Sequence, residues 1–277
     1  MSSTSAGGPS WIKFNRPICA ENRPGGGFFS PAWSATLPAL LALLLFPGSV
    51  RSQSPPDPSG IYKQAMTELQ NGNLDQAVSG FNKVLEKDPG NADAYKNRGL
   101  AYERKGQDDL AFSDYNKAIQ LNPRFAKAYN NRGNVYLKRK QMDLAFSDYN
   151  KAIECNPKLS VIYLNRGSAY AEKGQYDTAI ADYNKARELN PKDARAYLKR
   201  GLAFKSKGEL EQAIGDFTTA VELDPQNTEV YLERANIYYS QKRYDKTWED
   251  VHKAQELGYQ FEPAILEDLR KRSGREK

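Results

Sequence analysis

The chain of 277 residues has few side chains of the kinds that most enzymes and metal sites require. It contains one histidine, His252, and two cysteines, Cys19 and Cys155. These are too few for a metal centre, a nucleophile–base pair or a disulfide framework. The sequence also contains no phosphate-binding glycine loop, no Gly-x-Ser-x-Gly turn, no His-Glu-x-x-His motif and no Cys-x-x-Cys pair. We therefore predict no catalytic residue, no metal and no cofactor, and a protein that is not an enzyme.

The two residues with reactive side chains in the second half of the chain have ordinary interpretations. His252 lies beside Asp250 in a helical pattern, which is typical of a surface histidine. Cys155 lies near the end of a predicted helix. It is either a small buried side chain or, in an oxidising compartment, one half of an intermolecular disulfide.

The charge balance does not indicate a nucleic-acid partner. Forty Lys and Arg residues against 34 Asp and Glu residues leave a formal charge of +6 over the whole chain. Without residues 1–52 the balance is 36 to 33, or +3. An excess this small is far from the concentrated positive charge that nucleic-acid binding needs.

Residues 1–57 differ in composition from the rest and are expected to lie outside the folded part. Lys13, Arg16 and Arg23 precede a stretch without charge, and its densest apolar run is residues 37–46. Ten apolar residues after a basic stretch are typical of a signal peptide, and Val50 and Ser52 suit a cleavage site. We therefore predict a signal peptide over residues 1–52, followed by a linker over residues 53–57.

Two other interpretations of the same residues remain open. The uncharged stretch 24–50 is long enough to serve as an uncleaved membrane anchor, with the basic residues on the inner side. Under both the cleaved and the anchored interpretations the remainder lies outside the cytoplasm, either periplasmic, secreted or tethered facing outwards. In the third interpretation, residues 1–57 are a disordered extension, or the start codon has been assigned too early. The protein is then cytoplasmic.

A repeat of 34 residues organises the remainder. The segment Asp-Leu-Ala-Phe-Ser-Asp-Tyr-Asn-Lys-Ala-Ile occurs at 109–119 and again at 143–153. Prolines recur with the same shift, and so do alanines; the prolines are Pro89, Pro123, Pro157, Pro191 and Pro225. A fixed period of this length indicates a solenoid. Apolar residues recur at helical spacing within each repeat, so each unit is predicted to be two amphipathic helices.

Small residues are expected at the contact between the two helices of a unit. Gly133 and Ala145 are expected to let two backbones approach, while Tyr129, Tyr136 and Tyr149 fill the space between one unit and the next. The prolines end the second helix, and Gly106, Gly174 and Gly208 mark the turn inside a unit.

These residues resemble the tetratricopeptide repeat family. The family's large and small signature residues correspond to Tyr95, Gly99, Tyr102, Ala111, Tyr115, Ala118 and Pro123. The Asn-Arg-Gly triplets at 97–99, 131–133 and 165–167 are similar to bacterial members, and with the leader they suggest an exported bacterial protein. The resemblance implies an all-α, right-handed superhelical solenoid. Its six units are predicted at 58–91, 92–125, 126–159, 160–193, 194–227 and 228–259, followed by a capping helix and tail at 260–277.

One arginine position and one aspartate position recur in five of the six units. In the first unit both are missing together, as Gln64 and Gly80. This joint loss predicts that the arginine of one helix pairs with the aspartate of the other helix in the same unit, although an arginine ladder that binds a ligand is the alternative. The predicted pairs are Arg98 with Asp114, Arg132 with Asp148, Arg166 with Asp182, Arg200 with Asp216, and Arg234 with Asp250.

The resemblance also implies where a ligand would bind. Members of the family bind peptides in a concave groove lined by first helices, and one class clamps C-terminal carboxylates with Lys, Asn and Arg. The third to fifth units match that pattern in part, with Asn130 where the first lysine is required. The predicted peptide-binding residues are Lys127, Asn130, Asn134, Asn165, Arg195 and Lys199. The alternative is that these residues serve the fold or are simply solvated.

Further lysines predict an electropositive middle of the groove. Lys127, Lys138 and Lys205 lie there, with acidic residues such as Glu103 and Glu233 towards the ends. We predict a scaffold that binds a peptide segment of a protein partner. The alternatives are a clamp for acidic C-terminal tails, polyanion or nucleic-acid binding through the basic groove, and self-association through the similar units.

Overall fold

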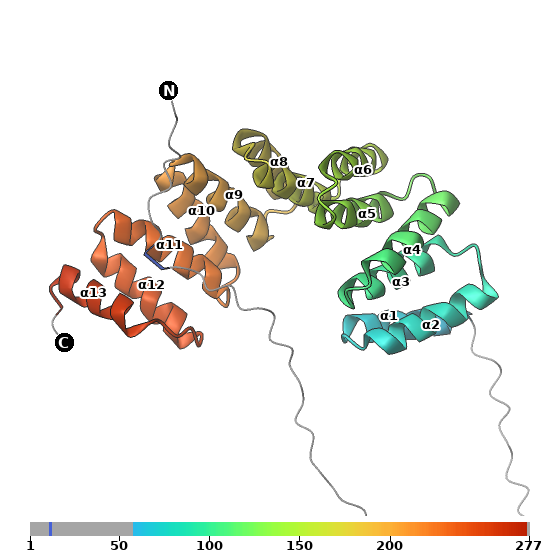
Figure 1. The fold of residues 1–277 in the computed structure, drawn as a ribbon, viewed down its shortest axis with the longest axis horizontal. Coiled ribbons are helices and arrows are strands. Elements are labelled where there is room, and N and C mark those ends of the chain that lie inside the picture. Colours follow the sequence, from blue (N-terminus) through green and yellow to red (C-terminus); the bar gives the residue numbers. More distant parts are fainter. Residues whose placement is uncertain (1–10, 13–57, 276–277) are drawn as a thin grey trace, which may run out of the picture. The chain divides into compact units, whose positions relative to one another are not determined.

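The computed structural model describes residues 11–12 and 58–275. This part of the chain contains thirteen helices and no strand, so the expected all-α solenoid is confirmed. Figure 1 shows the helices following one another in pairs. In chain order they are α1 (Pro58–Gln70), α2 (Leu74–Lys87), α3 (Ala92–Arg104), α4 (Asp108–Leu121), α5 (Ala126–Lys138), α6 (Met142–Cys155), α7 (Ser160–Glu172), α8 (Tyr176–Leu189), α9 (Ala194–Lys207), α10 (Leu210–Leu223), α11 (Thr228–Ser240), α12 (Tyr244–Glu256) and α13 (Pro263–Ser273).

Contacts between helices run almost entirely between neighbours in sequence. Each odd-numbered helix from α1 to α11 packs on the even-numbered helix that follows, and each even-numbered helix packs on the next odd-numbered one. The odd-numbered helices also touch one another from pair to pair between α1 and α9. A chain with only nearest-neighbour contacts is stabilised by stacking, as in other solenoids.

The turn inside each pair needs one residue in the left-handed backbone region. Gly106, between α3 and α4, has a φ of 73°, which glycine adopts without a steric penalty. The same place in the next pair is occupied by Lys140, with a φ of 61°. A side chain at a positive φ is strained, so this pair keeps the turn at a cost in stability.

Each connection between pairs contains one of the recurring prolines. Helix α4 ends at Leu121, and Asn122 is extended with φ −132° and ψ 92°. Pro123 follows directly. The residue before a proline is disfavoured in the helical region, which explains why the second helix stops where it does in the first five pairs.

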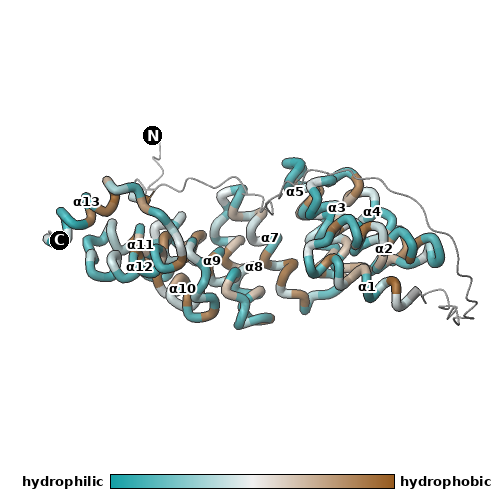
Figure 2. The backbone as a smooth tube through the Cα atoms, turned by 90° about the horizontal axis from the view of Figure 1, so that it is seen from below, coloured by the Kyte–Doolittle hydropathy of each residue, from teal (hydrophilic) through white to brown (hydrophobic). Residues whose placement is uncertain are grey.

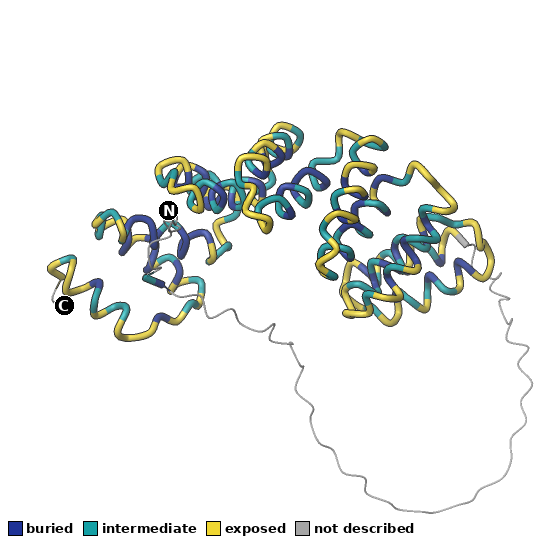
Figure 3. Tube along the Cα trace, turned by 45° about the horizontal axis from the view of Figure 1, so that its top comes forward, coloured by how far each residue is buried: buried dark blue, intermediate teal, exposed yellow. Residues whose placement is uncertain are grey.

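The core is a row of apolar clusters between helices. Figure 3 shows the buried residues on the sides of the helices that face neighbours, and Figure 2 shows short hydrophobic stretches alternating with hydrophilic ones. The ring of Tyr149 is fully buried, and it lies against Gly133 within one pair. An added Cβ on Gly133 would be 2.8 Å from Cε1 of Tyr149. The small residue makes room for a ring, which was not expected. At the equivalent Gly99 an added Cβ would also lie 3.2 Å from the backbone oxygen of Ala111, so the close approach of the two helices was expected correctly.

The last pair departs from the pattern and carries α13. Helix α13 begins with Pro263 and ends at Ser273, and the next residue, Gly274, is left-handed. Its Leu269 is fully buried in a cluster formed mainly by α10 to α13, to which α9 adds Leu198; we refer to it as the cluster of α10 to α13. Trp248 Nε1 donates to Ser273 Oγ at 3.1 Å, which ties α12 to the end of α13.

Two residues of the predicted leader pack on this last part of the chain. Ile12 is fully buried in the cluster of α10 to α13, and Trp11 packs against the same cluster. The expectation that residues 1–57 lie outside the fold is therefore wrong for Trp11 and Ile12. The remaining predictions for residues 1–52 and for the linker, including a tether at 24–50, fall outside the described residues. Among the helices that are described, none has both the length and the apolar character needed to cross a bilayer.

Candidate functional site

The recurring arginines lie on the first helices and pair with the aspartates of the second helices in the same unit. Arg98 Nε donates to Asp114 Oδ2 at 2.8 Å, and Arg98 Nη2 donates to Asp114 Oδ1 at 2.7 Å. The same fork recurs in Arg132–Asp148, Arg166–Asp182, Arg200–Asp216 and Arg234–Asp250, at 2.5–3.0 Å.

The remaining guanidinium nitrogen of each arginine bonds to the preceding unit. Arg132 Nη1 donates to Asn116 Oδ1 at 2.6 Å, and its carbon lies 5.5 Å from the ring centre of Tyr129. Hydrogen bonds to Asp148 raise the pKa of Arg132 although burial opposes this. Sequence reasoning missed this bond between units, although its acceptor recurs at one repeat position: Asn82, Asn116, Asn150, Asn184 and Thr218. All three guanidinium nitrogens of each of these arginines bond within the fold, so these arginines have a structural role.

The predicted clamp amides are brought together but bond to protein groups. Asn165 Nδ2 donates to Asn130 Oδ1 at 3.0 Å, and Asn130 Nδ2 donates to Asn131 Oδ1 at 3.2 Å. Asn134 Oδ1 accepts from Tyr149 Oη at 2.7 Å. A ligand would have to compete for these amides.

The two basic residues predicted on α9 differ in their surroundings. Arg195 forks onto Asp193 at 2.8 and 2.7 Å, and this contact lowers the pKa of Asp193. Lys199 is half-buried. Burial lowers its pKa, against the opposing effect of Glu229. No carboxylate of the described residues lies within 4 Å of the Lys199 ammonium group, so Lys199 is a cation with capacity for an anion.

The expected basic groove is mostly neutralised. Lys138 Nζ lies 3.2 Å from both Glu103 and Asp108, and Lys205 Nζ lies 2.5 Å from Glu233. These lysines reach across to acidic residues of the neighbouring unit. The expectation that Lys138 and Lys205 add free positive charge is therefore wrong.

A hollow of about 210 Å³ lies between α3, α5 and the start of α7. It contains two of the predicted residues, Lys127 and Asn130, and a lysine that sequence reasoning missed, Lys96. Burial lowers the pKa of Lys96, and Lys127 lowers it further while Asp93 opposes. The signal was present, because Lys96 holds in the second unit the position of Asn130, where the resemblance requires a lysine. The full lining is Lys96, Leu100, Lys127, Asn130, Asn131, Leu159, Val161 and Ile162.

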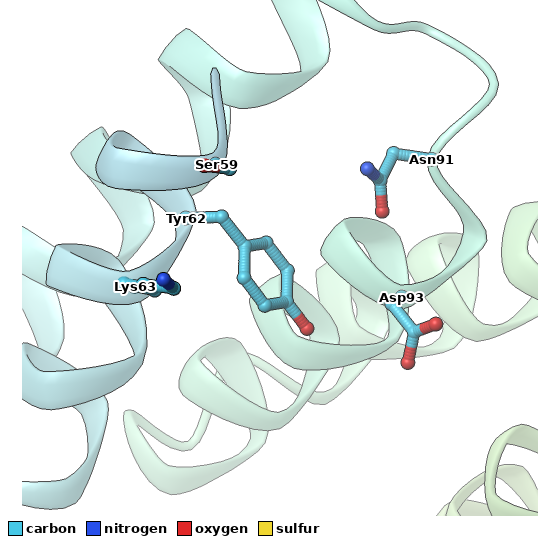
Figure 4. A pocket seen from close by; sticks show the side chains of 5 residues that line it. All are labelled: Ser59, Tyr62, Lys63, Asn91 and Asp93. Carbon is cyan, nitrogen blue, oxygen red and sulfur yellow. The ribbon is translucent and has the colours of Figure 1, made fainter. Parts of the chain in front are cut away.

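Two further hollows lie towards the ends of the helical array. The first, of about 470 Å³, is lined by Ser59, Tyr62, Lys63, Asn91 and Asp93 (Figure 4). Burial raises the pKa of Tyr62, and the charge of Asp93 raises it further. The Tyr62 Oη accepts a hydrogen bond from Asn97 Nδ2 at 2.6 Å. The second, of about 270 Å³, is lined by Trp248, His252, Arg270 and Arg275.

The described residues contain one free thiol and one imidazole besides the charged groups. No group of three or more His, Cys, Asp or Glu side chains within residues 11–12 and 58–275 is arranged to hold a metal ion. Cys155 is a half-buried free thiol. His252 lies 5.3 Å from the ring of Trp248.

Comparison with family models finds one kind of repeat along most of the helical part. Together the matches cover more than half of the chain, and a search of curated proteins found no match. Models described as tetratricopeptide repeat match residues 62–123, 126–159 and 148–181, and a model described as TPR repeat matches residues 167–208 and 201–242.

Several solved structures have a similar fold. A crystal structure of MamA is 27% identical, with 60% of this chain and 96% of that chain covered and a TM-score of 0.50. YrrB, described as a TPR protein with an unusual peptide-binding site, is 24% identical over 69% of this chain and 97% of that chain, with a TM-score of 0.52. The pilF protein of Pseudomonas aeruginosa is 21% identical over 77% of this chain and 97% of that chain, with a TM-score of 0.67.

Proposed function

The chain belongs to the tetratricopeptide repeat family, and from this premise we propose that it is a scaffold that holds a protein partner by a peptide segment. The segment binds across α3, α5 and α7 and carries an acidic group next to an apolar side chain. The observation that supports this is Lys96. It is a half-buried cation whose pKa is lowered by burial, at the edge of a hollow that also contains Leu159 and Ile162.

Within the part of the chain that the structure describes, the charge of Lys96 has no opposite charge in contact with it. Among the described residues no carboxylate lies within 4 Å of the Lys96 ammonium group, which donates to the neutral oxygen Asn97 Oδ1 at 2.5 Å. Burying a charge without an opposite charge lowers stability. A ligand carboxylate would supply the missing charge, and the apolar side chains beneath would take an adjacent leucine-sized group.

The test is a set of eight-residue fluorescent peptides in a Ser/Gly background, each with one leucine and one glutamate at spacings of one to four residues. We expect at least one to bind the full chain, and both Lys96→Met and the exchange of its glutamate for glutamine to weaken it at least tenfold. Lys185→Met is the matched control, because Lys185 is exposed on α8 and pairs with Glu188.

Two results would contradict the proposal. One is that no peptide of the set binds. The other is that a peptide binds equally well to the Lys96→Met chain. Loss of binding through unfolding is distinguishable, because removal of this half-buried charge is not expected to lower the melting temperature.

We also propose that residues 1–52 act as a leader that places the repeats outside the cytoplasm. The composition of that segment supports this proposal. Membership of the tetratricopeptide repeat family does not favour one compartment over another. The intact mass and cell fraction of the protein from its own host provide the test. A full-length cytoplasmic species would refute the proposal, whereas a species beginning near Gln53, or a full-length species in the membrane, would support it.

A further inference from the structure

The last helical pair already has an extended segment bound to it, namely Trp11 and Ile12 of the same chain. Residues 11–12 appear as the short blue segment beside α11 in Figure 1. The ring of Trp11 stacks on Tyr239, with 4.1 Å between ring centres and 6° between planes. Ile12 is fully buried, and its backbone N–H donates to Asn236 Oδ1 at 2.8 Å. One aromatic side chain, one aliphatic side chain and one backbone group are thus recognised together.

The side-chain oxygen of Asn236 is available for this contact because the last unit differs from the third unit at one repeat position. It holds the position that Asn134 holds in the third unit, where the amide oxygen accepts from Tyr149 Oη. Val251 stands at the position of Tyr149 in the last unit, and it has no hydroxyl group. The oxygen of Asn236 is therefore open to an incoming N–H.

The other half of the Asn236 amide is unsatisfied. The residue is only 5% exposed, and its Nδ2 has no hydrogen-bond partner in the part of the chain that the structure describes. A buried donor without an acceptor is costly and calls for an explanation. An extended segment offers N–H and C=O groups along its backbone, so a carbonyl of a bound segment is the natural acceptor for this donor.

The aromatic platform also exists only in the last unit. The positions equivalent to Tyr239 are Glu103, Leu137, Ala171 and Lys205 in the second to fifth units. The cap helix holds Tyr239 in place, because the Tyr239 hydroxyl group donates a hydrogen bond to Asp268 Oδ2 and Arg272 Nε donates to Asp268 Oδ1 at 2.8 Å. The site is thus built where the last unit departs from the repeat.

We propose that Asn236, Tyr239 and the adjoining cluster of α10 to α13 form a docking site for an extended segment with an aromatic residue followed by a branched aliphatic residue, and that the chain's own Trp11–Ile12 occupies it. This site is separate from the hollow at Lys96 and does not depend on peptide binding there. If residues 1–52 are removed, or if an anchor at 24–50 holds Trp11 and Ile12 on the inner side of a membrane, the occupant is taken from the site, and the site opens to a partner segment of the same chemistry.

The experiment uses the full chain and a fluorescent peptide of residues 7–16, GGPSWIKFNR. We expect the peptide to bind the double variant Trp11→Ala/Ile12→Ala at least tenfold more tightly than it binds the unaltered chain, because the site of the unaltered chain is occupied. In that double variant, Asn236→Leu should weaken binding at least tenfold. The fold accepts leucine at this repeat position, as Leu100 and Leu202 show. Ser168→Leu, at the same position in the fourth unit, is the matched control and should leave binding unchanged.

A second measurement does not depend on the double variant. The amide hydrogen of Ile12 should exchange at least tenfold more slowly in the unaltered chain than in Asn236→Leu. The proposal is overturned if the Ile12 exchange rate is the same in both chains, or if a peptide with both Trp and Ile exchanged for Ala binds equally well. A dimer by light scattering that Trp11→Ala/Ile12→Ala abolishes would place the occupant on a second copy, and would overturn the assignment to the same chain.

Discussion

Replacing Gly133 by alanine tests whether the ring of Tyr149 requires the small residue there. The new Cβ would lie 2.8 Å from Cε1 and 3.0 Å from Cδ1 of Tyr149. The ring is fully buried, and its hydroxyl group is held by Asn134 at 2.7 Å. It has neither the space nor the freedom to move away.

The magnitude follows from two opposing effects. Overpacking of a close-packed core costs about 1–3 kcal/mol, while alanine is favoured over glycine inside a helix by about 1 kcal/mol. Gly215 separates the two effects, because it lies inside α10 with no atom within 4 Å of an added Cβ. Gly215→Ala should therefore stabilise the chain by about 1 kcal/mol. The difference between the two variants isolates the steric clash, which we expect to be about 1–3 kcal/mol.

The assay is urea unfolding of the full chain followed by circular dichroism. Gly201→Ala adds a graded comparison, because Phe217 lies as close as Tyr149 does but has no hydroxyl group to anchor it. Its ring is freer to shift, so the loss of stability should be smaller than for Gly133→Ala. The reasoning is refuted if Gly133→Ala is as stable as Gly215→Ala.

Three other variants test the charges and the turns, each by the same unfolding assay. Arg132→Ala should lower the stability by about 3–5 kcal/mol, because the carboxylate of Asp148, whose side chain is 7% exposed, is then buried without its partner. Lys151→Ala removes one half of an exposed pair and should change the stability by less than about 1 kcal/mol. Equal losses in the two variants would contradict this expectation. Lys140→Gly should stabilise the chain by about 1 kcal/mol, since it relieves a positive φ of 61°, and a loss would show that the turn is not strained. Burial lowers the pKa of Lys96 in the folded chain. Between that lowered pKa and the ordinary value near 10.4 the unfolded chain binds more protons, so stability rises with pH. This rise should be smaller in Lys96→Met, and identical stability profiles of the two chains would refute the prediction.

The order of the helices was predictable because it depends on local chemistry. A left-handed glycine such as Gly106 ends one helix, and a proline such as Pro123 ends the next. Both signals repeat every 34 residues, so the helical period and the breaks reinforce each other. The pairing of Arg132 with Asp148 was open to inference for a similar reason, since the first unit lacks both residues at once.

The contacts between units were not predictable in the same way. Lys138 is neutralised by Glu103 of the preceding unit, a contact that depends on how far one helix pair is rotated against the next. The amides expected to face a ligand, including Asn130, instead bond to one another across units. Trp11 was missed because its partner, Tyr239, is far away in sequence and lies in a unit that departs from the repeat.

The bond from each arginine back to the preceding unit has a consequence for how such a chain can change its length. Because Arg132 meets Asn116 just as Arg166 meets Asn150, the joints in the middle of the array are interchangeable. The segments 109–119 and 143–153 are identical in sequence, so the helices that meet at these joints also match. An extra block of 34 residues added there would meet matching joints on both sides. The ends lack this freedom, since the first unit has no such arginine and the last carries the cap, so growth or shortening of the array is confined to its interior.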